Sequence, residues 1–548
     1  MSPALYELPN ELLANIAGHL LCEPSSLRSL ARSSRHFQAI AEPVLYRSIF
    51  FRTGAQLIRL QQSLASAPWR FKSVHSLDVR WKYLPAGTAV GEPHALADMI
   101  KAAPNIDDLT IESPYCNNDA WRQATAVSRW SQAMDMWLEP IILAAVPSKM
   151  LWGPRPLQAL KRLTLHLNGT SREFWTLERE YTWILAHPTL EDLHLSSINL
   201  PHDVSGAVHP SSNSPLKRLI LDEANVTLDG LRSVLSFPRA LECLYIGENR
   251  YSHIEQAFPR GQRYNCLAIR DVEAFMKVLR LQKHSLQSFT YVSNEISLGA
   301  QGPGPRKQID VDFSMFEVLR EMSLSGCHER TMLTWCAQNK GPPCLEELTV
   351  DEYVFCDVLV NDEPPASQPH RFFKELTEAA PHLGQFDVIG TSTFDFSVPP
   401  MVHAREAAAV AGQYLAEKGC VSCFWRGPSR RQIVRPVLFG EVEPGNILMY
   451  VNDEDGFRVA VKPLHSGNMD ENNEDDGEID GEVSEDVSDE SEDDDEMSSD
   501  EEGASEEDVH ETDEEFDDGS DMDRVDWGIT DMDLVNVIAA DMDFYNDP

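Results

Sequence analysis

The sequence predicts an α/β chain in four parts. These are an N-terminal three-helix unit, a repetitive region with a strand and a helix per repeat, a small α+β extension and an acidic tail. Three observations predict this order. Apolar residues recur at helical spacing over residues 5–50, and an apolar triplet then recurs ten times between residues 74 and 388. After residue 469 the composition changes to Asp, Glu and Ser, which is typical of a segment that cannot build a core.

The first helix is predicted by apolar residues at a spacing of four, namely Leu8, Leu12, Ile16 and Leu20. Pro9 suits its first turn, where a missing N–H costs nothing. A second short helix is expected through Leu27 and Leu30, and a third from Phe37 to Ala41, stopped by Pro43. We assign residues 1–52 to this three-helix unit.

The repeat consists of an apolar residue, two others, an apolar residue, one other and a third apolar residue. Its copies begin at residues 74, 106, 160, 190, 216, 241, 286, 319, 345 and 383. The shortest steps between copies match the 20 to 29 residues of a leucine-rich repeat, and the longer steps imply insertions. Since one strand and one helix cannot bury a core alone, the sequence predicts an irregular leucine-rich-repeat solenoid over residues 53–400.

The longest step contains an insertion at residues 112–155 that is rich in tryptophan, including Trp121, Trp130 and Trp137. These three fall about two helical turns apart. Two interpretations remain open. The tryptophans could pack the insertion onto the solenoid, or they could anchor a partner, because tryptophan is favoured at the centres of interfaces.

Residues 401–468 have a different pattern. A helix is expected over Ala404–Lys418, ending at Gly419, followed by short strands at Ile433–Phe439, Ile447–Val451 and Phe457–Val461. We expect this extension to cap the last repeat, because the open end of a solenoid exposes its core.

The tail over residues 469–548 holds 37 acidic residues and one basic residue, Arg524. It carries 36 of the chain's 42 net negative charges, and we expect it to be disordered. A nucleic-acid binder needs a surplus of Lys and Arg, so direct binding to nucleic acid is not expected. Near its end, Asp-Met-Asp recurs every ten residues around Trp527, Leu534 and Ile538. This segment could form an amphipathic helix that binds a basic or apolar groove, or it could remain a solvated tail.

Chemical motifs are mostly missing from the sequence. There is no phosphate-binding loop, nucleophile elbow or His-Glu-x-x-His helix. Cys420 and Cys423 form a lone pair, whereas a zinc site needs four ligands, so two ordinary thiols are favoured over a metal site. We expect no catalytic residue, cofactor or metal. No secretory signal or membrane span is evident either, which predicts an intracellular protein, cytoplasmic or nuclear.

The first 50 residues resemble an F-box. The resemblance lies in Leu8-Pro9-x-Glu11-Leu12-Leu13 with Ile16 and Leu20, in Leu27-x-x-Leu30 with Phe37, and in the phrase Leu45-Tyr46-Arg47, which is similar to fungal F-box proteins. It implies the substrate receptor of a Skp–cullin–F-box ubiquitin ligase, which binds a cullin through the Skp adaptor. The residues that it places on the adaptor are Leu8, Pro9, Leu12, Leu13, Ile16, Leu20, Leu27, Leu30 and Phe37.

Such a receptor performs no chemistry itself, and its repeats bind an unknown protein target for ubiquitination. The candidates for target contacts are Trp121, Trp130 and Trp137. Two other functions stay open. The chain could be a non-ligase F-box scaffold whose acidic tail binds basic proteins, or an enzyme, although no catalytic constellation is visible.

Overall fold

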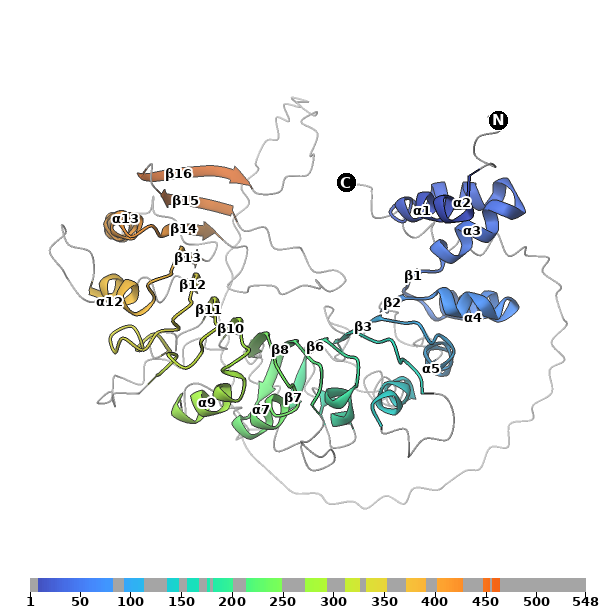
Figure 1. Cartoon of the computed structure of the whole chain (residues 1–548), viewed down its shortest axis with the longest axis horizontal. Helices are drawn as coiled ribbons and strands as arrows, with labels where there is room; N and C mark the ends of the chain where they lie inside the picture. Colours follow the sequence, from blue (N-terminus) through green and yellow to red (C-terminus); the bar gives the residue numbers. More distant parts are fainter. Residues whose placement is uncertain are drawn as a thin grey trace, which may run out of the picture. The chain divides into compact units, whose positions relative to one another are not determined.

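The structure is a computed structural model. It describes residues 8–81, 93–112, 136–146, 155–166, 175–177, 181–200, 213–248, 272–292, 311–325, 332–351, 371–390, 402–426, 447–453 and 456–463. In this part of the chain, three N-terminal helices lead into one large sheet that is followed in sequence order from its first strand to its last (Figure 1). None of the described helices is both long and apolar enough to cross a membrane.

The N-terminal helices are α1 (Asn10–His19), α2 (Pro24–Ser33) and α3 (Arg35–Leu45). They share a small core of Ala17, Leu27, Ala31 and Ala41. The helix that we expected to stop at Pro43 continues to Leu45, so that prediction is wrong. Pro43 lies in the last turn, where its missing N–H removes a single hydrogen bond, and the Tyr46 N–H closes the helix on the Glu42 carbonyl at 3.0 Å.

The sheet begins directly after α3. The main path of the described sheet has fourteen strands, which are β1 to β4, β6 and β8 to β16. Beside it, β5 pairs with β7, and β7 pairs with β8. Pairing is parallel from β1 to β14 and antiparallel from β14 to β16. The bounds are β1 Ser48–Phe51, β2 Ser76–Arg80, β3 Asp108–Glu112, β4 Arg162–His166, β5 Trp175–Thr176, β6 Asp192–Ser196, β7 Ile198–Leu200, β8 Arg218–Val226, β9 Cys243–Glu248, β10 Ser288–Val292, β11 Glu321–Ser325, β12 Glu347–Asp351, β13 Gln385–Gly390, β14 Val421–Arg426, β15 Ile447–Asp453 and β16 Gly456–Pro463.

The ten apolar triplets of the sequence all lie at strands of this sheet, from β2 to β13. Their second and third residues pair in register with those of the next copy, as in Leu77 with Leu109 and Val79 with Ile111. Because successive strand residues point to opposite faces, these apolar positions share one face. They form a continuous buried core along the sheet.

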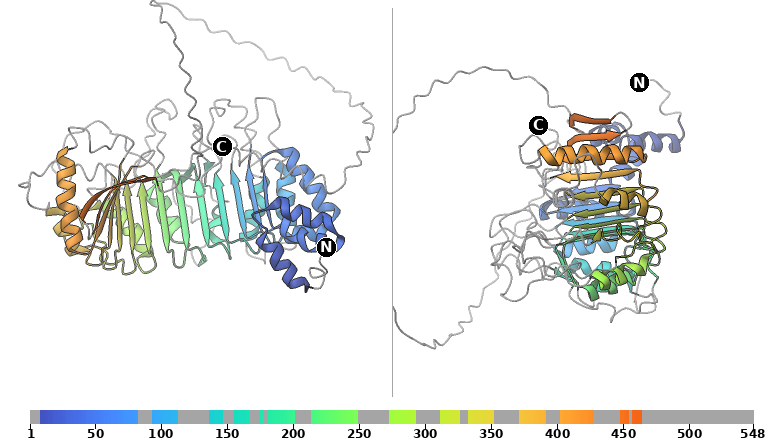
Figure 2. Two further views of the ribbon diagram at one scale, coloured as in Figure 1. Left: turned by 90° about the horizontal axis from the view of Figure 1, so that it is seen from above. Right: turned by 90° about the vertical axis from the view of Figure 1, so that its left-hand side faces the viewer.

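Helices cover that apolar face (Figure 2). They are α4 (Gly54–Ser66), α5 (Pro93–Ala102), α7 (Leu228–Leu235), α9 (Val272–Leu279), α12 (Arg371–Ala379) and α13 (Val402–Glu417). We expected an α-helix in every repeat, but in the described residues some repeats have none. Before β6 the described connection is the 3-10 helix η5 (Tyr181–Ala186), whose Ile184 and Leu185 are buried. A short turn of this kind buries two apolar residues in less chain than an α-helix needs.

The tryptophan-rich insertion is described in part. Residues 136–145 are helical, and Trp137 packs with Leu138 and Ile141 in the main core at 1% exposure. This agrees with the packing interpretation for Trp137. Trp121 and Trp130 lie outside the described residues.

The C-terminal extension continues the same sheet. Its helix α13 ends at Glu417, and Gly419 follows with a positive φ of 79°, as expected for a glycine that ends a helix. The strands expected at 447–451 and 457–461 are β15 and β16, whereas 433–439 lies outside the described residues. The sequence analysis missed β14, which pairs in parallel with β13. The acidic tail also lies outside the described residues.

Candidate functional site

The first candidate surface lies on α1. The helix begins after Pro9, whose carbonyl accepts the N–H groups of Leu12 and Leu13 at 3.0 and 3.1 Å. Leu13 and Ala17, four residues apart, face the helical core. Leu12 and Ile16, also four residues apart, lie side by side on the outer face at 48% and 43% exposure.

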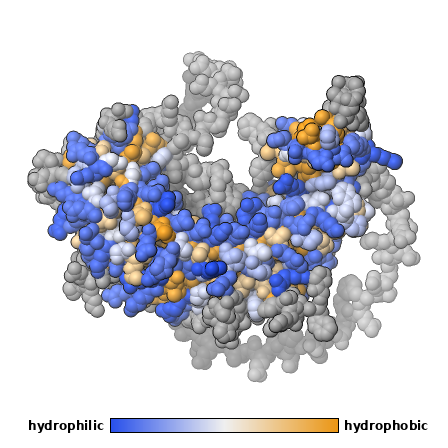
Figure 3. All heavy atoms as spheres, in the orientation of Figure 1, coloured by the Kyte–Doolittle hydropathy of each residue, from blue (hydrophilic) through white to orange (hydrophobic). Residues whose placement is uncertain are grey.

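Leu21, just beyond the helix, is also exposed, at 41%. We call Leu12, Ile16 and Leu21 the α1 surface. Apolar side chains gather over the N-terminal helices in Figure 3, at the upper right. Three large apolar side chains exposed within ten residues mark a surface that favours burial by a partner.

The structure divides the nine residues expected to contact the adaptor into three groups. Pro9, Leu12 and Ile16 are exposed; Leu8, Leu20 and Leu30 are half-buried; Leu13, Leu27 and Phe37 are buried. The buried side chains hold the three helices together. In this chain taken alone, the exposed group is the part that a partner can reach.

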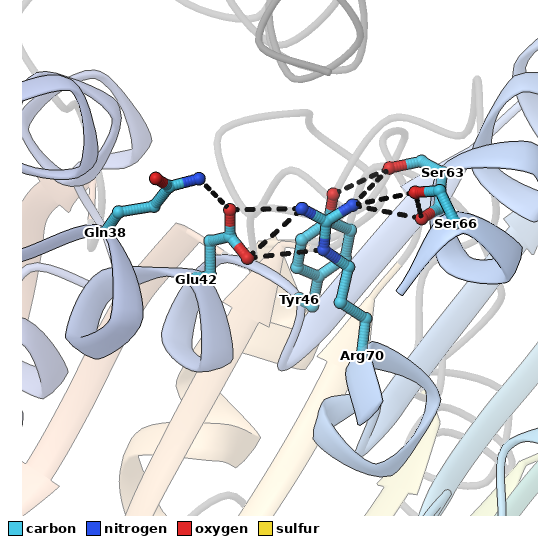
Figure 4. Close-up of polar contacts among 6 residues, drawn as sticks. All are labelled: Gln38, Glu42, Tyr46, Ser63, Ser66 and Arg70. Atoms are coloured by element: carbon cyan, nitrogen blue, oxygen red, sulfur yellow. Dashed lines mark hydrogen bonds and ion pairs between the residues drawn. The ribbon is translucent and has the colours of Figure 1, made fainter. Parts of the chain in front are cut away.

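A polar network joins the helices to the sheet region (Figure 4). It connects Glu42 of α3 with Arg70 of the 3-10 helix η2 (Pro68–Ser73), which follows α4. Arg70 Nη2 donates to both carboxylate oxygens of Glu42 at 3.1 and 3.2 Å, and its Nε donates to Oε2 at 3.3 Å. Gln38 Nε2 also donates to Glu42 Oε1, at 2.6 Å.

The other end of the guanidinium bonds to α4. Arg70 Nη1 donates to the Ser63 carbonyl at 3.0 Å, and the guanidinium lies over the Tyr46 ring at 5.2 Å from its centroid. The Tyr46 hydroxyl bonds to Ser63 Oγ at 2.9 Å. Arginine suits this position because its planar fork can bind a carboxylate and stack on an aromatic ring together. The network was not predicted from the sequence, in which Glu42 and Arg70 lie 28 residues apart.

The second candidate surface is the sheet face opposite the buried leucines. Its first strand position alternates in charge over β3, β4, β6 and β8, with Asp108, Arg162, Asp192 and Arg218 in register. Arg162 pairs with Asp108 at 2.8 Å, and Arg218 pairs with Asp192 at 3.7 Å. These charges largely satisfy one another, so this row offers no strong field of a single sign to a ligand.

Two histidines are buried on the same face, further along the strands. His166 of β4 and His194 of β6 are both enclosed, and burial lowers the pKa of each to about 3. His194 Nε2 lies 3.0 Å from Ser196 Oγ, while its Nδ1 has no hydrogen-bond partner among the described residues. A catalytic serine–histidine pair needs a basic imidazole oriented by a third group, so this geometry does not favour nucleophilic catalysis.

The cysteine pair of the sequence analysis lies at the start of β14. Cys420 and Cys423 are buried, and burial raises the pKa of each thiol to about 12, with Asp387 adding to the shift. Such thiols stay protonated at neutral pH, whereas metal ligation requires the thiolate. In the described part of the chain, no three His, Cys, Asp or Glu side chains gather closely enough to hold a metal ion.

Comparison with protein families identifies one region. Residues 5–52 match the F-box-like family model, and they include all three N-terminal helices. A search of curated proteins finds no significant match to the chain. The N-terminal unit is therefore an F-box-like domain, which supports an F-box protein. The leucine-rich repeats and the fungal origin stay predictions.

Proposed function

We propose that this chain, whose residues 5–52 are an F-box-like domain, is the substrate-recognition subunit of a Skp–cullin–F-box ubiquitin ligase. F-box domains generally bind the Skp adaptor, and the exposed α1 surface beside Pro9 offers a place for it. The observation that carries the proposal is the family match on a helical unit whose Leu12 and Ile16 side chains point away from its own core. In this role the protein is intracellular and leaves catalysis to its partners.

The energetics of the α1 surface suit an adaptor contact. Full burial of a leucine or isoleucine side chain contributes about 1.5 to 3 kcal/mol. Leu12 and Ile16 are already about half buried, so covering the rest of both contributes about 1.5 to 3 kcal/mol. That is about a fifth to a third of the roughly 8 kcal/mol of a micromolar complex. Leu13, Leu27 and Phe37 would act indirectly by holding α1 in place.

We propose that the sheet region binds the protein target and that it consists of leucine-rich repeats. Its support is the arrangement of the ten triplets, each on a strand that pairs with the next in sequence order. Stacked repeats of this kind present an extended surface to a protein target. The insertion, with Trp121 and Trp130, adds candidate contacts, and the acidic tail could recruit basic targets.

The test is co-purification of the Skp adaptor and cullin with the full chain. A Leu12→Asp/Ile16→Asp variant places two charges on the α1 surface while leaving the buried Leu13 intact. The matched control is Leu281→Asp/Met315→Asp, which makes the same kind of change at exposed apolar residues of the sheet region. We expect wild type and control to capture adaptor and cullin, and the α1 variant to capture neither.

Equal capture by the α1 variant would overturn the assignment of this surface. Absence of both partners from the wild-type sample would overturn the ligase proposal itself. Capture of the adaptor without the cullin would favour the second candidate, a non-ligase F-box scaffold. That candidate is supported by the 36 net negative charges of the tail, which suit a basic client. Client binding through the tail should weaken between 0.1 and 0.5 M salt, because exposed charges are then screened within about 10 Å or less.

A further inference from the structure

The F-box-like domain differs in charge from the rest of the protein. Residues 5–52 contain five arginines and four glutamates, a small net positive charge, although the chain as a whole has a net charge of −42. One of the glutamates, Glu42, is bound by Arg70 from outside the domain. Of the arginines, Arg32, Arg35 and Arg47 are exposed. The domain that carries the α1 surface is therefore a basic region of an acidic protein.

The end of the acidic tail has the complementary pattern. Trp527, Leu534, Ile538 and Tyr545 are spaced by 7, 4 and 7 residues, which places them on one face of a helix. Eight aspartates surround them between residues 521 and 547, against the single base Arg524. An apolar strip bordered by acidic residues fits an apolar surface on a basic domain.

We propose that residues 527–545 dock as an amphipathic helix on the α1 surface and cover Leu12, Ile16 and Leu21 within the same molecule. The segment then competes with the adaptor for that surface. The competition rests on the proposed function, whereas the docking itself does not. The tail thereby becomes a reversible internal inhibitor of assembly, favoured at low salt and opposed by adaptor excess.

The length of the chain permits this contact. The last described strand, β16, ends at Pro463, which leaves 63 residues before Trp527. Fully extended, they would span about 200 Å. The path along the sheet from β16 back to β1 covers only about 60 Å, at about 4.8 Å between neighbouring strands. The r.m.s. end-to-end distance of a random coil of 63 residues is about 45 Å, and like charges make such a coil longer.

Tethering makes a weak contact sufficient. An effective concentration on the order of 1 mM is typical of a flexible linker that can span its sites. A helix that binds the α1 surface with a dissociation constant of roughly 0.1 to 0.5 mM would then be mostly docked. Such docking weakens the apparent adaptor affinity about three- to tenfold, which a binding measurement resolves.

The experiment compares three full-length proteins by hydrogen–deuterium exchange of residues 10–19 and by titration with purified Skp adaptor. They are the wild type, a Leu534→Asp/Ile538→Asp variant and the matched control Val483→Asp/Val487→Asp, which alters the tail outside the docking segment. We expect α1 of the docking variant to exchange faster and the adaptor to bind it three- to tenfold more tightly. The control should behave like the wild type, and 0.5 M salt should move the wild type toward the docking variant.

Equal α1 exchange in all three proteins would overturn the proposal. So would α1 protection in the wild type that rises with protein concentration, because a second copy would then be the occupant. Faster exchange in the docking variant, combined with no adaptor binding by any of the proteins, would support the docking and reject the proposed function. The two proposals can therefore fail separately.

Discussion

Arg70 and Glu42 form a bidentate ion pair that connects the F-box-like helices to the sheet region. Their side chains are only 6% and 11% exposed. Glu42 belongs to α3 and Arg70 to the connection between α4 and β2. Tyr46, which ends α3, also enters the main hydrophobic core. The helical unit is thus joined to the first repeat by a polar network and by apolar packing, in addition to the chain itself.

Replacement of Arg70 by methionine should destabilise this junction strongly. Removal of one partner leaves the Glu42 carboxylate buried without its main counter-charge, which typically costs 3 to 5 kcal/mol. We expect the free energy of unfolding to fall by about 3 kcal/mol in urea denaturation. Arg162→Met, which breaks an ion pair of an arginine 61% exposed, should cost less than about 1 kcal/mol.

A Glu42→Leu/Arg70→Met double variant completes the cycle. It removes both charges, so its loss should be smaller than the sum of the two single losses. Strict additivity of the single losses would mean that the two residues act independently, contrary to the geometry of the network.

The strands could be predicted from the sequence because their signal is local. The second and third residues of each triplet are two positions apart, which is the period of a strand. Leu77 and Val79, for example, lie in β2. β14 was not predicted because Val421–Arg426 stands outside the triplet pattern. The end of α3 was also misplaced, since the effect of Pro43 depends on its distance from the helix end.

The candidate site could be predicted only in part. Leu12 and Leu13 have the same side chain and adjacent positions, so apolar spacing alone cannot tell which one faces the core. That division depends on where α2 and α3 pack, which is a tertiary property. The Arg70 network has no sequence motif, because long-range pairs of common residues leave no spacing to recognise.

A second stability prediction concerns Gly341. A Cβ atom at this position would lie 2.4 Å from the Ala379 carbonyl oxygen and 2.6 Å from the Trp335 ring, closer than real contacts allow. Gly341→Ala should therefore lower the free energy of unfolding by about 1 to 3 kcal/mol. The matched control is Gly384→Ala, whose Cβ would meet only the Glu346 carbonyl at 3.8 Å. Its effect, measured in the same urea denaturation, should lie near zero, and equal losses would contradict the steric explanation.

The cysteines should separate into two classes on alkylation. Cys22 and Cys344 are exposed, whereas Cys420 and Cys423 are buried with pKa values raised to about 12. Because the thiolate is the reactive form, iodoacetamide at pH 8 should modify the exposed pair and spare the buried pair in the folded protein. Peptide mass spectrometry measures this directly, with urea-unfolded protein as the control in which all four react. Rapid labelling of Cys423 in the folded chain would contradict the predicted burial.

The buried histidines predict how stability depends on pH. Burial lowers the pKa of His166 and His194 to about 3 in the folded state, against about 6.5 in the unfolded chain. Above pH 6.5 both states leave these rings neutral. As the pH falls below 6.5, only the unfolded chain gains the protons, so stability is lost progressively down to about pH 3. At pH 5.5 each buried histidine should lower the free energy of unfolding by about 1.4 kcal/mol.

The measurement is the free energy of unfolding at pH 7.0, 6.0 and 5.5. This pH range lies above the range in which ordinary carboxylates titrate. A His166→Gln/His194→Gln variant provides the comparison. Its free energy of unfolding can differ from that of the wild type at every pH, but it should change less between pH 7.0 and pH 5.5. An unchanged slope in that variant would show that other groups cause the pH dependence.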